Sequence, residues 1–262
     1  MRPAGRLLAV IVAILALTAC SERSGPVQVQ TRELPQFKAI DMEGAAALQI
    51  VVGSPNSVQI EATEKILDRI DTQVRDGTLY IRSRAKNWLP SREGRHVSVR
   101  ITLPELQVLR LGGGHRASIE GFAGGESQIK VEGAAQIQAS GHLDTLKVHL
   151  AGAGTANLAN LKSVNTHVTV DGVGRVVVHT SGTLDATMNG MGAIHYLGNP
   201  REVRTRMNGL GSIGRQDSAD AETDDEEVER SEKTRPEVDP EKLQPEYEDA
   251  KDWKKGGETE VI

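Results

Sequence analysis

Few residues of this sequence have the types and spacing that acid–base chemistry requires. A β-structured enzyme that acts on polysaccharide needs carboxylates grouped on one surface, to bind a metal or to work as a proton donor and acceptor pair. Asp144 and Asp185 are the candidates for that work, whereas Glu132 and Asp171 each precede a glycine and more simply serve a turn. Because the four are scattered along the chain, the sequence favours a protein without catalytic residues.

The histidines and the glycine-rich segments indicate neither a metal nor a cofactor. His149 and His167 are expected near equivalent positions of neighbouring repeats, yet two imidazoles make an incomplete zinc site. His115 occupies an expected inward position. The run from Gly209 to Gly214 matches G-x-G-x-x-G, but no helix pattern follows it. The dinucleotide fingerprint needs a helix N-terminus to hold a pyrophosphate, so we interpret this match as a corner of the chain.

The elements that position these residues follow from a glycine that recurs every 18 to 20 residues. Such a period is typical of a chain that coils on itself, with one supersecondary unit per turn. A residue without Cβ suits a sharp corner or a positive φ. We therefore expect one corner per coil at Gly113, Gly133, Gly152, Gly172, Gly190 and Gly209.

Apolar and polar residues alternate on both sides of each glycine. Leu109, Leu111, Ala117 and Ile119 flank the first one, while odd offsets carry residues such as Lys130. This alternation predicts two half-buried strands per repeat, with the remaining residues as a third, shorter side. The fold class is therefore all-β, a single-stranded parallel β-helix (β-solenoid) with about 19 residues per coil. Equivalent strands would stack about 4.8 Å apart, in a right-handed coil.

Both ends of such a stack need covers, because terminal coils expose their strand edges. Strands are predicted at 46–52, 57–62, 78–82 and 97–103, where they form the first coils and the N-terminal cap. The other end is expected to be covered after Ile213, by Gly214 and Arg215 or by the segment that follows.

The N-terminus has the pattern of an export signal. Arg2 and Arg6 precede an apolar run that is too short to span a membrane, and Leu-Thr-Ala then leads to Cys20. This end resembles a bacterial lipobox, which implies a signal peptide at 1–19, acylation of Cys20 and attachment to membrane lipid. Residues 20–34 are expected to be a polar tether. The absence of Asp after Cys20 favours the outer membrane of a Gram-negative bacterium.

Charge separates the rest of the chain into two parts. Residues 216–262 contain 18 acidic and seven basic residues, so we expect 215–262 to be an acidic disordered tail. The N-terminal third is basic. Its positive charge would attract anionic glycans or lipid headgroups. We favour the alternative, that these are solvent-facing strand residues which only discourage pairing of strand edges with other chains. Trp88 is the one candidate for an exposed, sugar-binding aromatic, and we favour the interpretation that it anchors a loop over the cap. Nucleic acid is not an expected partner of an exported protein. The basic residues are Arg82, Arg84, Lys86, Arg92, Arg95, Arg100, Arg110 and Arg116.

Residues 35–214 resemble the auto-transporter adhesin, head GIN domain family (domain of unknown function 2807). The resemblance rests on the segments Leu48-Gln49-Ile50-Val51-Val52-Gly53 and Val99-Arg100-Ile101-Thr102-Leu103-Pro104. It rests further on the Gly-x-Gly coils that end in Gly190-Met191-Gly192-Ala193-Ile194. It implies a β-helix with pectin-lyase-like stacking, a role in adhesion or the cell envelope, and no catalytic residues.

The favoured interpretation is a non-enzymatic, lipid-anchored β-helix whose rigid outer faces present a binding surface in the cell envelope, for adhesion or envelope maintenance. Envelope glycans or other surface macromolecules are the expected partners. The alternative is a polysaccharide-binding or polysaccharide-degrading β-helix of the pectin-lyase-like type. A third possibility is an assembly subunit that stacks end to end.

Overall fold

The computed structural model describes residues 26–84 and 97–216. The helix in these residues is α1 (Glu64–Leu67), which is too short to cross a membrane. The expected signal peptide, Cys20, Trp88 and the tail beyond Gln216 lie outside these ranges. The strands are β1 (Val27–Arg32), β2 (Ala39–Val52), β3 (Ser57–Thr63), β4 (Ile70–Arg75), β5 (Thr78–Ser83), β6 (Ser98–Leu103), β7 (Val108–Ala123), β8 (Glu126–Val131), β9 (Ala134–Leu150), β10 (Ala153–Val170), β11 (Val173–Met188), β12 (Met191–Leu197), β13 (Glu202–Met207) and β14 (Leu210–Arg215).

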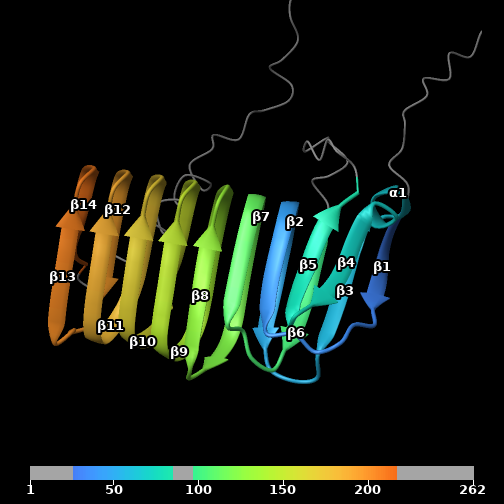
Figure 1. The fold of residues 1–262 in the computed structure, drawn as a ribbon, viewed down its shortest axis with the longest axis horizontal. Coiled ribbons are helices and arrows are strands. Elements are labelled where there is room, and N and C mark those ends of the chain that lie inside the picture. The colour runs from blue at the N-terminus through green and yellow to red at the C-terminus, as the bar shows by residue number, and fades with distance from the viewer. Residues whose placement is uncertain (1–25, 85–96, 217–262) are drawn as a thin grey trace, which may run out of the picture. The chain divides into compact units, whose positions relative to one another are not determined.

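Each coil consists of two strand legs, joined by a glycine corner on one side and by a bend on the other (Figure 1). In β10, residues 153–158 form the first leg and residues 165–170 the second, and both pair in parallel with the same legs of β9 and β11. Between the legs of β10, residues 161–163 pair with 141–143 of β9, and residues 162–163 pair with 179–180 of β11. The third, shorter side that the sequence predicts is therefore present in these coils as a short paired segment between register shifts. The chain makes about five such turns, so the predicted β-solenoid is confirmed.

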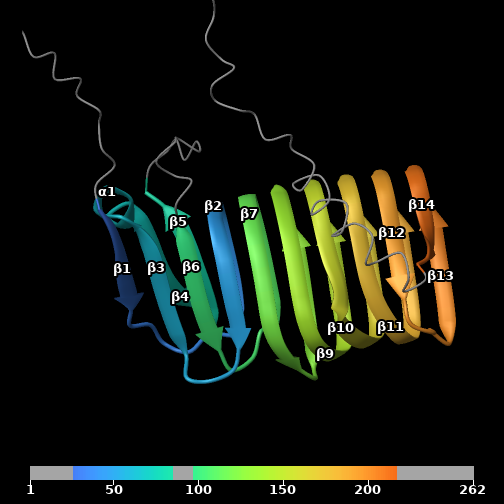
Figure 2. The ribbon, with the colours of Figure 1, turned by 180° about the vertical axis from the view of Figure 1, so that it is seen from behind.

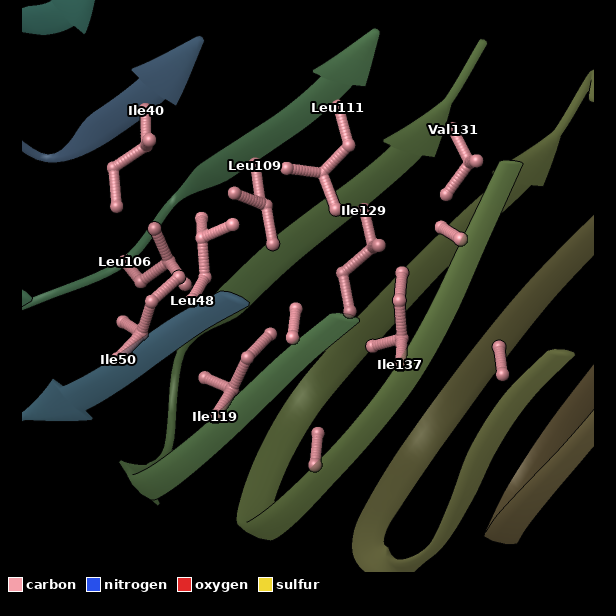
Figure 3. Packing of buried hydrophobic residues seen from close by; sticks show 14 of the residues in the cluster. Ile40, Leu48, Ile50, Leu106, Leu109, Leu111, Ile119, Ile129, Val131 and Ile137 are labelled. Carbon is pink, nitrogen blue, oxygen red and sulfur yellow. The ribbon is translucent and has the colours of Figure 1, made fainter. Parts of the chain in front are cut away.

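The core lies between the two series of legs. Figure 3 shows Leu109 and Ile129 from one series and Ile119 and Ile137 from the other, all with their side chains in the space between the legs. Each of these four side chains is at most 1% exposed. Alternation of this kind buries one side of each inner leg and leaves the other side in solvent, as the sequence predicts.

The six recurrent glycines lie over one another at the corner. A Cβ on Gly133 would approach the carbonyl oxygen of Gly113 to 2.1 Å, and a Cβ on Gly152 would approach that of Gly133 to 1.8 Å. The series continues through Gly172, Gly190 and Gly209 at 1.8–1.9 Å. Of the six, only Gly113 has a positive φ. Of the two reasons expected for a glycine, positive φ applies to Gly113, whereas at the other five corners close approach of backbone to backbone excludes a side chain.

Antiparallel strands cover the N-terminal end, on the side away from β14 in Figure 2. β3 pairs antiparallel with β6, and β4 and β5 form a hairpin whose turn, Asp76 and Gly77, has positive φ at both residues. The predicted strands of this region are confirmed. The expected tether at 20–34 is in part wrong, because Val27–Arg32 form β1, which pairs antiparallel with β3.

The C-terminal end of the described stack is formed by β13 and β14. β13 pairs with the second leg of β11, and β14 pairs with β12. Gly214 and Arg215 continue β14 instead of covering the end, so that expectation is wrong. The alternative cover, the segment after Gln216, lies outside the described residues.

Candidate functional site

The outer surface of the first legs carries a sheet face of amides, hydroxyls and arginines. Cross-strand pairing aligns Gln49 with Ser118, Ser118 with Gln138, and Gln138 with Asn157. A second row, made of Arg116, Gln136 and Thr155, runs beside the first and two residues nearer the corner. In both rows every side chain is exposed except Ser118, which is half-buried. We call this surface the amide face, and it comprises Gln49, Arg100, Arg116, Ser118, Gln136, Gln138, Thr155 and Asn157.

The pleat of each leg positions these side chains. In β9, Gln136 and Gln138 alternate with Ala135, Ile137 and Ala139, which are buried between the legs. Because the partners of a parallel pair share one side of the sheet, burial of the apolar set holds the polar set outward in every coil. The face is thus a consequence of the core.

Two hydrogen bonds between neighbouring coils order part of the amide face. The Nε of Arg100 donates to Oε1 of Gln49 at 3.0 Å, and the Nε of Arg116 donates to Oε1 of Gln136 at 3.1 Å. Each amide so engaged keeps its NH₂ group for another partner. The defined face contains no carboxylate, and its two charged residues are both arginines. It can donate and accept hydrogen bonds along a row and favours neutral or anionic partners.

The outer surface of the second legs differs because its charges pair with one another. Lys147 Nζ lies 2.5 Å from Glu126 Oε1, Arg206 lies 3.3 Å from Asp185 Oδ1, and His149 Nε2 lies 3.5 Å from Asp171 Oδ2. We call this surface the ionic face, and it comprises Glu126, Lys130, Lys147, His149, Thr169, Asp185, Thr187 and Arg206. Exposed pairs of this kind contribute little stability, but they leave fewer free charges for a ligand than isolated side chains would.

Asp144 and Asp185, the candidates for acid–base work, are not brought together. The Oδ2 of Asp144 accepts a hydrogen bond from the backbone N–H of Gly125 at 2.9 Å, which holds the bend. Asp185 lies on the second leg of β11, between His167 and Arg204 of the adjacent coils. The whole coil of β10 separates the two carboxylates. Each therefore has a structural partner and neither faces a second carboxylate as an acid–base pair requires.

The carboxylate that precedes Gly172 belongs to a ladder along the corner. The Oδ1 of Asp171 accepts from Nδ2 of Asn189 at 2.6 Å, and Oδ1 of Asn189 accepts from Nδ2 of Asn208 at 2.9 Å. Equivalent corners of three coils are linked in this way. Asp171 thus serves the turn, as its place in the sequence indicates.

The two histidines expected to approach each other occupy different columns. His149 pairs across the sheet with Thr169, whereas His167 pairs with Lys147 and Asp185. The expected juxtaposition is wrong. Within the described ranges, no group of three His, Cys, Asp or Glu residues could hold a metal ion.

His115 is buried at the inward position where the sequence places it. Its Nε2 donates to the carbonyl oxygen of Gly112 at 3.1 Å. Burial lowers the pKa of His115, against the opposing effect of its backbone hydrogen bonds. Its cross-strand neighbours are Ala46 and Ala135, so an uncharged environment surrounds the imidazole.

The basic residues of the N-terminal third are partly engaged with neighbours. Arg82 lies 3.0 Å from Asp41 and stacks over the ring of Tyr80, and Arg84 lies 3.1 Å from Asp71. Lys86, Arg92 and Arg95 lie outside the described residues. Arg100 and Arg116 are the two that belong to the amide face.

A family model described as "Putative auto-transporter adhesin, head GIN domain" matches residues 36–200. The chain belongs to this family. The fold of this chain is similar to that of several solved structures. One is a putative adhesin from Bacteroides fragilis, with a TM-score of 0.57 and 20% sequence identity. The match covers 73% of this chain and 97% of the adhesin chain. A putative adhesin from Parabacteroides distasonis has a TM-score of 0.45 and 15% identity, covering 73% and 98%. Among curated proteins, none matches this head GIN domain chain.

The amide face is the feature that the sequence analysis did not identify in this head GIN domain. A signal was present, since Gln136 and Gln138 follow Gly133 at the same offsets as Thr155 and Asn157 follow Gly152. The N-terminal part of the face, Gln49 and Arg100, could not be located by counting residues from the repeated glycine. Arg100 lies on β6, which precedes the first glycine of the repeat.

Proposed function

We propose that this head GIN domain protein is a non-enzymatic, lipid-anchored protein of the cell envelope that binds glycans through its amide face. The observation that carries the proposal is the row of exposed amide, hydroxyl and arginine side chains in lateral register over successive coils. Sugar hydroxyls need donors and acceptors, and amides supply both.

Three further points support this function. The family is described as an adhesin family, and the similar structure from Bacteroides fragilis is described as a putative adhesin. The backbone beneath the face is hydrogen-bonded on both sides in the inner coils, so few degrees of freedom are lost on binding. The lipobox-like end of the signal, with Cys20 as the acylated residue, would hold the protein at the outer membrane.

The test of glycan binding uses a printed array of neutral, uronic-acid and sulfated glycans. The triple variant Gln136→Ala, Gln138→Ala and Asn157→Ala should weaken binding at least about tenfold, since three or more hydrogen bonds of roughly 1 kcal/mol each are removed. A matched triple variant on the ionic face, Lys130→Ala, Thr169→Ala and Thr187→Ala, should bind as the unchanged protein does.

Three results would count against the proposal. Equal loss in both triple variants would show that the amide face has no special part in binding. Absence of binding to every glycan class would remove glycans as partners. Release of shorter products from a bound glycan, lost on Asp144→Asn or Asp185→Asn, would favour the polysaccharide-degrading alternative.

The lipid anchor needs a separate experiment. Cells that produce the full chain should incorporate radiolabelled palmitate into it, and the Cys20→Ala variant should incorporate none and leave the membrane fraction. Unchanged labelling of that variant would refute attachment through Cys20, without bearing on glycan binding.

A further inference from the structure

The C-terminal end of the described stack leaves two strand edges unpaired. Within residues 26–84 and 97–216, β13 pairs only with β11 and β14 pairs only with β12. Each strand therefore presents one row of backbone N–H and C=O groups with no ladder partner. Such edges are templates for pairing with another strand.

The hydrophobic core is open at the same end. Val203 and Met207 of β13 lie in register with Leu184 and Met188 of β11, which are 1% and 0% exposed. Val203 and Met207 themselves are 41% and 43% exposed. They occupy inward positions of the coil but have no further coil to cover them. Covering this apolar surface would be favourable.

Within the described residues, the N-terminal end also has a free strand edge, that of β1, whose Val27 and Val29 are 53% and 63% exposed. The core beneath that end is covered, because α1 buries Ile66 and Leu67, and the β4–β5 hairpin buries Ile70 and Leu79. Only one of the two cores would therefore gain cover if the open end docked onto the N-terminal end of another copy. A second C-terminal end, by contrast, has the same unpaired edges and the same exposed ladder.

We propose that two copies of this chain pair through their C-terminal ends, β13 against β13 and β14 against β14, about a two-fold axis perpendicular to the legs. That axis maps each leg onto the same leg of the second copy and reverses its direction, so both edge pairs are antiparallel. The two cores then become continuous. The arrangement is isologous, the commonest symmetry of soluble dimers.

Charge selects the register of the β13 pair. Thr205, Val203 and Met207 must stay inward, so only registers centred on a residue are allowed. Centres at Arg204 or Thr205 pair the most of β13. A centre at Thr205 sets Arg204 opposite Arg206 twice. A centre at Arg204 sets Glu202 opposite Arg206 twice and Arg204 opposite its own copy once. Opposite charges across a pair are favourable and like charges are not, so two attractive pairs against one like-charge contact assign the centre to Arg204.

The charged groups of this register are available in the single chain. The side chains of Glu202 and Arg206 are 50% and 63% exposed, although Glu202 lies 2.6 Å from Arg204 and Arg206 lies 3.3 Å from Asp185. In the dimer Arg206 would lie between Asp185 and the second copy's Glu202. The two Arg204 side chains that meet at the centre each keep Glu202 of their own chain as a partner.

Cross-linking of the full chain in cells tests this register. At the two-fold centre the Cα atoms of residue 204 in the two copies lie about 5 Å apart, which is within disulfide range. The variant Arg204→Cys should form a covalent dimer under mild oxidation. Lys130→Cys, on an inner coil, should not, and the unchanged chain reports any background from Cys20.

Charge reversal in the Arg204→Cys background tests the pairing. Glu202→Arg or Arg206→Glu alone should lower the cross-linked fraction at least about fivefold, because two attractive pairs become repulsive. The two together should restore it. Circular dichroism of each variant in detergent checks its fold, and sedimentation of the unchanged full chain in detergent should show a monomer–dimer equilibrium.

The proposal is overturned by any of three results. These are a monomer at all concentrations, equal cross-linking at residues 130 and 204, and failure of the double reversal to restore the dimer when both single variants remain folded. The first of these would favour a cover from elsewhere in the chain. None of them bears on glycan binding by the amide face.

Discussion

The corner glycines show how a missing Cβ sets the approach of one coil to the next. A methyl group at most of these positions would lie within about 2 Å of a backbone oxygen, a distance that side-chain rotation cannot relieve. The neighbouring coil must shift, and with it the ladder hydrogen bonds of both legs. The cost therefore falls on the whole coil, not on one contact.

Gly152→Ala should lower the free energy of unfolding by about 3 kcal/mol or more, because the added Cβ would meet the oxygen of Gly133. Urea denaturation followed by circular dichroism measures the change. The matched control is Gly53→Ala, where a Cβ has nothing within 4 Å and φ is not positive. That variant should change stability by less than about 0.5 kcal/mol, and similar effects of both substitutions would contradict the backbone-contact explanation.

His115 should make stability depend on pH below its ordinary pKa of 6.5, because burial lowers the pKa in the folded state. The unfolded chain then binds the proton more readily, so this contribution is complete above pH 6.5 and is lost as the pH falls towards the folded pKa. His115→Ala, which matches Ala46 and Ala135 of its column, should flatten urea midpoints measured across that window. Replacement of the exposed His167 is the control, and an equal flattening there would refute the assignment.

At the scale of elements, each leg gains its stability from ladders that run across coils. The same inward position is occupied by Leu146, Thr166, Leu184 and Val203 in four successive second legs. Leu184 is buried between two neighbours, while Val203 has a coil on one side only. Burial, and with it the transfer free energy, therefore depends on place in the stack.

Leu184→Ala should cost about 2–5 kcal/mol of unfolding free energy, since it opens a cavity in a filled ladder. Val203→Ala removes side-chain atoms that are already 41% exposed, so it should cost less than about 1 kcal/mol under conditions where the chain is monomeric. Thermal and urea denaturation of the two variants provide the comparison. Equal costs would mean that the last coil is as well packed as the inner ones.

On the scale of the solenoid, coils are interchangeable to the extent that their registers agree. Ala153 pairs with Val173 on one side and with Ala134 on the other, and the second legs match in the same way. A repeat architecture of this kind draws its stability from each coil and from nearest-neighbour interfaces.

Deleting residues 153–172 should leave a folded solenoid that is one coil shorter, because Val173 can then pair with Ala134. Small-angle scattering should show the stack shortened by about 4.8 Å, with the strand content kept in circular dichroism. Deleting residues 153–162 removes half a coil, so that every later first leg would meet a second leg and every later corner would meet a bend; that variant should not fold. A folded half-coil deletion would contradict the stacking of equivalent legs.

Much of this fold could be predicted from the chain alone. Alternation with period two around glycines about 20 residues apart identifies two strand legs per coil and which side chains lie inside. The position of His115 was correct for that reason. The separation of His149 from His167 was also within reach, since they precede Gly152 and Gly172 by three and five residues.

Other features were decided only by the tertiary structure. Val27 and Val29 of β1 are both exposed, so no buried pattern marked that strand, and its place depends on the free edge of β3. The corner glycines are required by a backbone one coil away, which no local pattern records. The amide face depends on β6 lying beside β2, far apart in sequence. Burial constrains inward residues to repeat, whereas outward residues are free to vary, so the surface is known only once the coils are stacked.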